Sequence, residues 1–578
     1  MRNSTFVVCS FLGLIFLAAS LIWFPKPAPV PANADGASST GASDSPSAEG
    51  SSSSSSAPTA DSKSAMAEPT DVDSSKSEAL TKAGENQNGE KQTAEKSKEG
   101  VKPAPRELQF TKWPKPSVAF VLTGEQHGYF EPCGCTANQL GGMTRRAGLF
   151  ARVRDLGWDV RGIDVGGISK RTGPQAQIKF ETTLDALREL KYVALGMGVE
   201  DLRLGAGALV PLHITDGEDP MAFLSANLVF FGVKDLGTPV AKRVVEMNGL
   251  KVGITSVMSD TIRKEVIADA SSETDITWSD PKEALTEVMK QFEEEGVKFR
   301  ILLSQSTLEE SRQFAKDFPS FDVIVAANGF GEGEPAPEMV GPVRMLQVGE
   351  KGKVAGVMAL YPDDKENPVR FELITLNGEQ FGDDPVMIEK MKSYQERLQN
   401  ERIVTADNPV GYPSGATFVG ASKCGECHTK AMAVWEKTPH AHALESLDPA
   451  NKRDGHERLH GIVRKFDPEC LACHVTGWDP KEYTRFRSGF LNAEYAENED
   501  EKKLEAMLAG NQCENCHGPG SRHIELIEAG QTEAAAKEVR VTLEQAKDVT
   551  CVKCHDVDNS PDYNFEKYWE DVKHPGRD

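Results

Sequence analysis

Positive charge is scarce in this 578-residue chain. Lysine and arginine number 65 against 88 aspartates and glutamates, which gives a formal net charge of −23 at pH 7. Proteins that bind nucleic acid cluster Lys and Arg to neutralise phosphates, so nucleic acid is not expected as a partner. The acidic balance instead predicts that a protein partner presents a basic docking face, because long-range charge steers such encounters.

Large apolar side chains are also scarce, but only in one part of the chain. Hydrophobic residues make up 39% of the sequence, and residues 26–112, with the run SSSSSS and repeated Ala, Pro, Glu and Lys, hold very few large ones. Such a segment cannot bury enough surface to offset the entropy lost on ordering. We expect residues 26–112 to be a disordered linker.

The chain opens on an apolar run over residues 6–24. Its length is close to the roughly 20 residues that cross a bilayer as a helix. Two interpretations stand: a transmembrane signal anchor over residues 1–25, or a signal peptide cut after Ala32-Asn33-Ala34. The run is long for a signal peptide, which favours the anchor. Both interpretations place the rest of the chain outside the cytoplasm, anchored on the periplasmic side of the membrane or exported.

Short apolar runs alternate with helical patterns over residues 113–385. SVAFVLTG, VRGIDVGG and VKFRILLSQS are typical of buried strands. PKEALTEVMKQFEEEG opens on Pro281 and closes on Gly296, as helix start and stop signals predict. The alternation predicts an α/β layered domain. The charged segment that follows, over residues 386–413, is expected to be a connector.

The order of landmarks in this domain resembles the calcineurin-like metallophosphoesterases, especially the 5′-nucleotidase group. The matching stretches are TGEQHGY, DVGG, GMGVED, LLSQS and AANGFGE. Among the metal ligands that the resemblance implies, His127 is kept and Glu125 replaces an aspartate. The other ligand positions hold Gly167, Met197, Gly198, Gln305, Asn328 and Phe330.

These replacements decide the chemistry expected of the domain. Two adjacent metal ions need several carboxylate, imidazole and amide ligands, and Gly, Phe and Met cannot supply them. We therefore expect the scaffold of a phosphoesterase without its activity. Cys133 and Cys135, in EPCGC, are interpreted as loop thiols or a short disulfide, with a redox or metal-binding pair as the alternative. His213 is expected to be a packed strand residue.

Four motifs of the form CxxCH fall within residues 414–578 and hold eight of the 11 cysteines. CxxCH is the attachment signature of c-type haem: two thiols bond the haem edge, and the His behind them becomes an axial iron ligand. Zinc is the alternative, but zinc gives no reason for a His behind every pair. We predict four covalently bound haem c groups. The attachment residues are Cys424, Cys427, Cys470, Cys473, Cys513, Cys516, Cys551 and Cys554, and the proximal ligands are His428, His474, His517 and His555.

The stretches KCGECHTKAMAVWEKTPHAHA and CENCHGPGSRH resemble the tetrahaem cytochrome c family typified by the electron acceptor of hydroxylamine oxidation in ammonia oxidisers. The resemblance implies distal iron ligands elsewhere in the region, and with three main donors for four irons it leaves open whether one haem is five-coordinate. The implied ligands are His440, His523 and His574, with His442, His456 and His460 as weaker candidates. The motif spacing does not decide which donor meets which iron.

The sequence thus predicts a multidomain protein: a membrane segment, a linker, an α/β domain and a mainly helical or irregular multihaem domain. Its favoured function is electron transfer between redox protein partners by a tethered, extracytoplasmic cytochrome. One alternative is a multihaem oxidoreductase acting on a small nitrogen or sulfur compound at an open haem. The other is a phosphoesterase or nucleotidase with a redox module, against which the missing metal ligands count.

Overall fold

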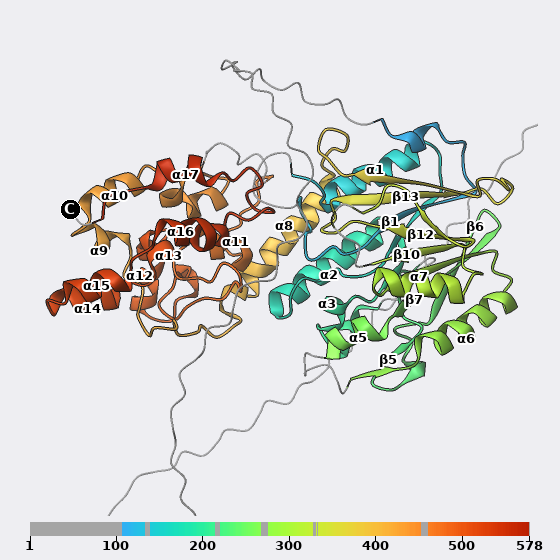
Figure 1. Ribbon diagram of the computed structural model, residues 1–578, viewed down its shortest axis with the longest axis horizontal. Coiled ribbons are helices and arrows are strands. Elements are labelled where there is room, and N and C mark those ends of the chain that lie inside the picture. The colour runs from blue at the N-terminus through green and yellow to red at the C-terminus, as the bar shows by residue number, and fades with distance from the viewer. Residues whose placement is uncertain are drawn as a thin grey trace, which may run out of the picture. The chain divides into compact units, whose positions relative to one another are not determined.

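The computed structural model describes residues 107–132, 139–213, 220–267, 275–327, 331, 333–451 and 460–576. The predicted anchor or signal peptide and most of the predicted linker lie outside these residues. Among the described helices, none is both long and apolar enough to cross a membrane. The described residues belong to one compact unit, Glu99–Asp578, in which an α/β domain precedes a mainly helical region (Figure 1).

Two six-stranded sheets form the centre of the α/β domain (Figure 1). The first has the order β14-β13-β1-β2-β3-β4. Strands β1 to β4 run parallel, whereas β13 and β14 form an antiparallel edge. The bounds are β1 Val118–Thr123, β2 Val160–Asp164, β3 Tyr192–Gly196, β4 Ala222–Leu224, β13 Val354–Leu360 and β14 Val369–Thr375.

The second sheet has the order β11-β12-β10-β9-β7-β6. Its central strands β7, β9, β10 and β12 are parallel, and β6 and β11 are antiparallel edges. The bounds are β6 Lys242–Met247, β7 Leu250–Met258, β9 Phe299–Gln305, β10 Val323–Ala326, β11 Glu338–Val340 and β12 Val343–Gln347, with β5 Leu228–Phe230 and β8 Ile276–Trp278 forming a separate pair.

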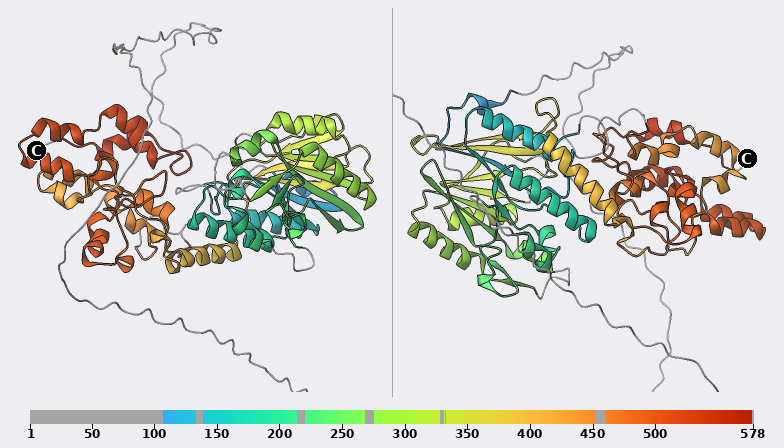
Figure 2. Two further views of the ribbon diagram at one scale, coloured as in Figure 1. Left: turned by 90° about the horizontal axis from the view of Figure 1, so that it is seen from below. Right: turned by 180° about the vertical axis from the view of Figure 1, so that it is seen from behind.

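Alternate side chains of each central strand enter different cores, because successive residues of a strand point to opposite faces. In β1, Val118, Phe120 and Leu122 pack between the two sheets, whereas Ala119 and Val121 face the helices on the outer side. A third core lies between the second sheet and the helices α6 Pro281–Glu294 and α7 Leu308–Asp317. Helices therefore cover the outer face of each sheet (Figure 2), which confirms the predicted α/β layered domain.

Three longer helices cover the first sheet: α1 Met143–Asp155, α2 Pro174–Glu189 and α8 Pro385–Asn400. Helix α8 begins where the Asp384 side chain accepts hydrogen bonds from two backbone N–H groups of the first turn. Its buried face belongs to the same core as α1 and α2, and it consists of Met387, Met391, Tyr394 and Leu398. The segment predicted as a connector is thus, in its first half, an integral helix of the α/β domain.

The α/β domain also begins earlier than predicted. The 3-10 helix η1, Gln109–Lys112, places Phe110 in the core with no exposed surface. One aromatic side chain in a polar stretch gives no periodic signal, so the sequence pattern predicts a start only at residue 113. The remaining short helices of this domain are α3 Val199–Leu202, α4 Ala206–Leu209, η2 Val210–Leu212, η3 Lys234–Leu236 and α5 Asp260–Ile267, and η4 Ile403–Thr405 follows α8.

The C-terminal region consists of short helices joined by irregular chain, as predicted. The first half holds α9 Ala421–Gly425, α10 Thr429–Trp435, η5 Pro439–His442, η6 Leu444–Leu447 and α11 Pro468–His474. The second half holds η8 Ala493–Tyr495, α12 Glu499–Leu508, α13 Cys513–His517, α14 Ser521–Glu528, α15 Thr532–Glu538, α16 Leu543–Gln545, the π-helix η9 Ala546–Thr550, η10 Cys551–Lys553 and α17 Phe565–Val572.

A charged pair is fully buried between α1 and the first sheet. The Arg146 guanidinium lies 4.0 Å (Nη1 to Oδ2) from the Asp164 carboxylate at the end of β2, and neither side chain is exposed. Asp164 also accepts hydrogen bonds from the Thr123 hydroxyl and the Gly166 backbone N–H. Burial raises the pKa of Asp164, although Arg146 and these two donors oppose the increase.

Replacing Arg146 with Met is expected to destabilise the α/β domain by about 3–5 kcal/mol, because it leaves a carboxylate buried without its countercharge. Urea unfolding followed by tryptophan fluorescence measures the change. The control is Arg152→Met on the exposed side of the same helix, for which we expect less than about 0.5 kcal/mol. Equal effects of the two substitutions would contradict the assigned role of the pair.

Candidate functional site

The residues aligned with phosphoesterase metal ligands meet at one edge of the α/β domain. Glu125 and His127 lie in the loop after β1, Gly167 follows β2, and Gln305 ends β9. The His127 Nε2 lies 3.2 Å from Glu125 Oε2, and the Gln305 amide donates to Glu125 Oε1 at 3.3 Å and to the carbonyl of Val165 at 2.9 Å. The structure therefore brings together the loops that the sequence resemblance identified.

Gly167 lies at the position of a bridging metal ligand. A Cβ on Gly167 would lie 3.1 Å from the Glu125 side chain, and the backbone there has a φ of +78°. The site is closed by hydrogen bonds between Glu125, His127 and Gln305. No group of three or more His, Cys, Asp or Glu that could hold a metal is found among the described residues, and Asn328, Phe330, Cys133 and Cys135 lie outside them.

The charge state of His127 is set by this cluster. Burial lowers the pKa of His127, but the hydrogen bond and negative charge of Glu125, together with Glu200 and Glu350, outweigh burial and raise it. The cluster therefore favours the protonated form of the imidazole, beside the Glu125 carboxyl group. His213, predicted on a strand, instead follows the 3-10 helix η2 and stacks on Phe223 at 5.1 Å.

Asp201 holds the loops around this site by hydrogen bonds to their backbone. Its carboxylate is fully buried and accepts backbone N–H groups of Gly167, Ser169 and Gly198 at 2.8, 2.9 and 3.0 Å. Burial raises the pKa of Asp201 to about 7 despite these three donors. The folded protein thus retains a proton here that an unfolded chain loses near pH ~4.

This proton makes the stability of the α/β domain depend on pH. The stabilisation is fully present below about pH 4 and is lost as the pH rises to about 7, with a slope of up to about 1.4 kcal/mol per pH unit. Urea unfolding between about pH 4.5 and 8 measures it. In Asp201→Asn, which cannot titrate, we expect this contribution to vanish. An unchanged pH profile in that variant would contradict the assignment.

The four CxxCH motifs lie on four separate short helical segments. The first spans the end of α9 and the start of α10, the second ends α11, the third forms α13, and the fourth contains η10. Their eight thiols form no disulfides. Cys513 is the main cause that raises the pKa of the Cys424 thiol, and Cys554 is the main cause that raises the pKa of the Cys473 thiol, so each of these thiols lies near its counterpart.

A third motif thiol is also influenced by its neighbours. Burial is the main cause that raises the pKa of Cys516 to about 11, and the charges of Cys551 and Cys513 add to it. These influences indicate that the third motif lies near the fourth.

Three of the four motif histidines each face one histidine from elsewhere in the region. The ring centroids are 6.2 Å apart for His428 and His523, 6.0 Å for His440 and His555, and 5.9 Å for His517 and His574. Two imidazoles bound on opposite sides of one metal place their ring centres about 6 Å apart, given metal–nitrogen bonds of about 2 Å. Each pair therefore has the spacing that an iron between two imidazoles requires.

The outer ring nitrogen of most of these histidines is already engaged. An Nδ1–H bonded to a carbonyl or hydroxyl fixes the ring and leaves Nε2 for a metal. The Nδ1 partners are the carbonyls of Gly576 for His428, Ala443 for His474, Val539 for His517, Ala535 for His523 and Pro575 for His574, and the Ser560 hydroxyl for His555. These acceptors carry no sequence signature, and sequence reasoning missed them all.

His474, in the second motif, differs from the other three. Its Nδ1 lies 2.7 Å from the carbonyl of Ala443 and 3.1 Å from the Ser446 hydroxyl, but no facing imidazole stacks against it among the described residues. Burial, then His555 and then His474 lower the pKa of His440 to about 4. His440 therefore lies near His474 as well as near His555.

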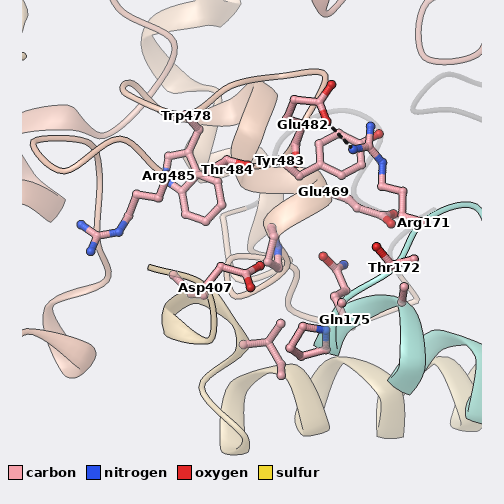
Figure 3. A pocket seen from close by; sticks show the side chains of 16 residues that line it. Arg171, Thr172, Gln175, Asp407, Glu469, Trp478, Glu482, Tyr483, Thr484 and Arg485 are labelled. Atoms are coloured by element: carbon pink, nitrogen blue, oxygen red, sulfur yellow. Dashed lines mark hydrogen bonds and ion pairs between the residues drawn. The ribbon is translucent and has the colours of Figure 1, made fainter. Parts of the chain in front are cut away.

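The weaker distal candidates lie elsewhere. His442 contacts Glu445 at 3.2 Å and His460 lies 3.5 Å from Asp383, and His456 is outside the described residues. A cavity of about 80 Å³ is lined in part by Pro468 and Glu469, directly before the second motif. Arg171 stacks over Tyr483 at its wall, 4.1 Å from the ring centroid (Figure 3).

The C-terminal region can now be compared with known proteins. Residues 423–518 match the family of cytochrome c554 and c-prime. Cytochrome c-554 of Nitrosomonas europaea is 33% identical over 113 residues, which make up 18% of this chain and 40% of that protein. The chain thus spans less than half the length of this curated relative. The predicted cytochrome c resemblance of the C-terminal region is confirmed.

Solved structures similar to this chain fall into two groups. Reduced cytochrome c554 from Nitrosomonas europaea has a TM-score of 0.18 and 26% identity, and covers 24% of this chain and 65% of its own. A 5′-nucleotidase precursor from Thermus thermophilus has a TM-score of 0.42 and 22% identity, and covers 49% of this chain and 59% of its own.

Proposed function

We propose that residues 414–578 bind four haem c groups and that the protein transfers electrons between redox partners outside the cytoplasm. The observation that carries this proposal is the set of three imidazole pairs, 5.9 to 6.2 Å apart, each formed by a CxxCH histidine and a distant histidine. Each haem c supplies an iron that takes up and releases one electron.

Different residues of the chain attach the haem groups and hold the irons. The eight motif cysteines attach the groups covalently, and the motif histidines hold each iron from one side. His523, His574 and His440 would hold the other side of the irons at the first, third and fourth motifs, in that order, and a second histidine ligand would keep such an iron low-spin. The mutual influence of the motif thiols supports a path in which the third and fourth haems lie between the first and the second.

A second function is favoured by one specific observation at the second motif. His474 has no facing imidazole among the described residues, and an iron held by His474 alone would leave its other side open to a small molecule. A cavity lined by Pro468 and Glu469 lies directly before this motif in the chain. We include reduction or oxidation of a small nitrogen or sulfur compound at this haem as the alternative function, tested by a high-spin signal that changes when such a compound is added.

The docking surface for a partner is expected around α16 and α17. Leu543 is 57% exposed, and Phe565 and Trp569 stack beside it at 5.6 Å. The rim of this apolar patch carries more acidic than basic residues: Glu544, Asp548, Glu566 and Glu570 against Lys547. An apolar centre with an acidic rim, next to the fourth motif and to His574, fits a basic redox protein.

Electron transfer to a basic monohaem cytochrome c tests this surface. We expect the bimolecular rate to fall at least about tenfold between low and high ionic strength, because salt screens the steering charges. Glu544→Gln with Asp548→Asn should lower the rate at low salt, whereas Glu499→Gln with Asp500→Asn, on the distant helix α12, should leave it unchanged. Equal effects of both pairs, or a rate independent of salt, would contradict the assignment.

The remaining proposals concern location and the α/β domain. A c-type cytochrome is assembled outside the bacterial cytoplasm, so we place this chain there, with residues 1–25 as its membrane anchor or as a cleaved signal. We also expect no phosphoesterase activity, because Glu125, His127 and Gln305 satisfy one another. Hydrolysis of a nitrophenyl phosphodiester in the presence of Mn²⁺ would contradict this expectation.

A further inference from the structure

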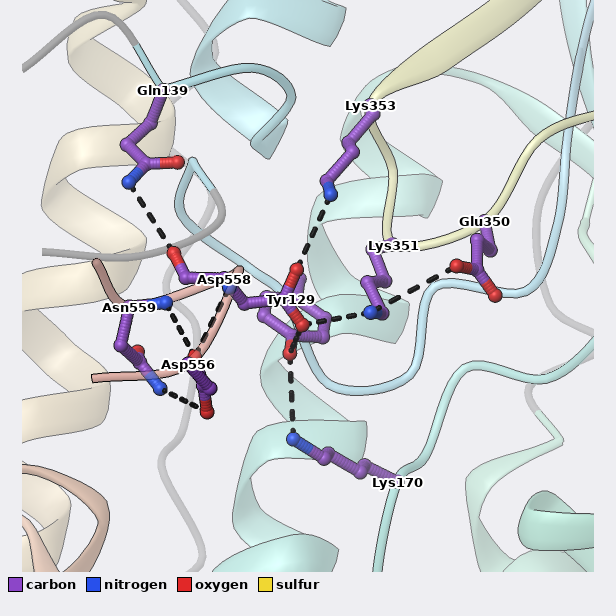
Figure 4. A network of polar contacts seen from close by, with 9 residues as sticks. All are labelled: Tyr129, Gln139, Lys170, Glu350, Lys351, Lys353, Asp556, Asp558 and Asn559. Atoms are coloured by element: carbon purple, nitrogen blue, oxygen red, sulfur yellow. Dashed lines mark hydrogen bonds and ion pairs between the residues drawn. The ribbon is translucent and has the colours of Figure 1, made fainter. Parts of the chain in front are cut away.

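Asp558, three residues beyond the fourth motif histidine, is held by the α/β domain. Its carboxylate lies 2.7 Å from Lys351 Nζ and 3.3 Å from Lys353 Nζ, and it accepts the Tyr129 hydroxyl at 2.9 Å (Figure 4). The Gln139 amide donates to its backbone carbonyl at 3.3 Å. Only 9% of Asp558 is exposed. We call Tyr129, Lys351 and Lys353 the Asp558 socket.

The socket is built from the rim of the closed site in the α/β domain. Tyr129 lies in the same loop after β1 as Glu125 and His127, and the two lysines lie between β12 and β13. The backbone N–H of Lys351 donates to the carbonyl of Glu125 at 2.6 Å. Lys170 adds a third positive charge, 5.0 Å from the centre of the Tyr129 ring. In an open site, this edge of the α/β domain would admit a substrate. Here the edge binds the Asp558 side chain of the same chain.

The loop from His555 to Ser560 links this socket to the fourth motif. Asp556 accepts the backbone N–H groups of Asp558 and Asn559 at 3.0 and 2.7 Å, and its carbonyl accepts that of Ser560 at 2.8 Å. The Ser560 hydroxyl lies 3.1 Å from Nδ1 of His555. Asp558 therefore fixes this loop to the α/β domain, and Ser560 of the same loop contacts the imidazole of His555.

We infer that the α/β domain sets the reduction potential of the fourth haem through Asp558 and Ser560, which act as positioning residues. This inference rests on the proposed haem attachment at Cys551 and Cys554. With Nε2 on the iron, Nδ1–H of His555 donates to Ser560. Such a bond makes the imidazole a stronger electron donor, favours the oxidised iron and lowers the potential.

Two substitutions in the full-length holoprotein test this arrangement by spectroelectrochemical titration. Ser560→Ala removes the acceptor and is expected to raise the potential of one haem out of four. Asp558→Asn frees the loop from the lysines and is expected to raise the potential of the same haem. Because both act on one hydrogen bond, the double variant should show less than the sum of the two shifts.

Matched variants separate the clamp from simple charge effects. Asp562→Asn removes one negative charge at an exposed position two residues beyond this loop, and we expect a smaller shift than with Asp558→Asn. Tyr129→Phe removes a single hydroxyl from the α/β domain without changing charge, and we expect it to move the potential of the same haem upward.

The outcomes distinguish failure of this inference from failure of the proposed function. Four haems with additive shifts, or with equal shifts for Asp558→Asn and Asp562→Asn, would overturn the inference and leave the cytochrome intact. A protein without haem at the fourth motif would overturn the proposed function itself. Thermal melting of each variant verifies folding, and Tyr129→Phe keeps the test decisive if Asp558→Asn does not fold.

Discussion

Replacing His523 with Ala is expected to convert one haem of the protein from low-spin to high-spin. The His523 ring faces that of His428 at 6.2 Å, and alanine leaves that iron with one protein ligand. About a third of the low-spin signal should be lost, since three irons have paired imidazoles, and the open iron should bind carbon monoxide when reduced. Electron paramagnetic resonance and reduced-minus-oxidised spectra measure both changes.

His442 provides the matched control for this substitution. It belongs to the same region, but it contacts the exposed Glu445 rather than another imidazole. His442→Ala should leave the spin states of all haems unchanged. A high-spin conversion caused by His442→Ala and absent in His523→Ala would contradict the ligand assignment given by the structure.

Replacing both cysteines of the third motif with Ala is expected to remove one haem and to destabilise the C-terminal region by several kcal/mol. Cys513 raises the pKa of Cys424, and Cys551 raises that of Cys516, which indicates that this motif lies near both the first and the fourth. The lost haem also leaves His574, at the end of α17, without the iron shared with His517. Groups that bind only the folded state contribute directly to its stability.

Intact mass and thermal melting measure the result. The mass should correspond to three haems, and the haem-region transition should shift down by about 10 °C or more, while the transition of the α/β domain stays in place. Cys133→Ala with Cys135→Ala removes another cysteine pair and should leave four haems and both transitions unchanged. A wild-type haem count in the third-motif variant would contradict the assigned attachment.

The sequence predicts the parts of this structure that depend on periodicity or on a chemical motif. Alternating apolar runs such as SVAFVLTG identify β1, because a strand buried on both faces must be apolar throughout. The order of landmarks around Glu125 and His127 predicts that the replaced ligands share one edge, because parallel strands end together there. CxxCH also identifies its histidines, because haem attachment requires this spacing of the two cysteines and the histidine.

The rest depends on contacts between residues distant in the sequence. The pairing of His440 with His555 crosses more than a hundred residues, and nothing in either stretch encodes it. The sequence of helix α8 resembles a connector because its charged residues mask a buried stripe of Met387, Met391, Tyr394 and Leu398. Asp558 is one acidic residue in an acidic chain, and only the lysines of another domain make it distinctive.

The most direct measurement of the central claim is the intact mass of the exported, full-length protein together with its spin-state spectrum. The account predicts four covalently attached haem c groups, three of them low-spin with two histidines each and one high-spin at His474. A colourless protein, or zinc bound by the sulfurs of Cys424, Cys470, Cys513 and Cys551 and their partners, would contradict the account.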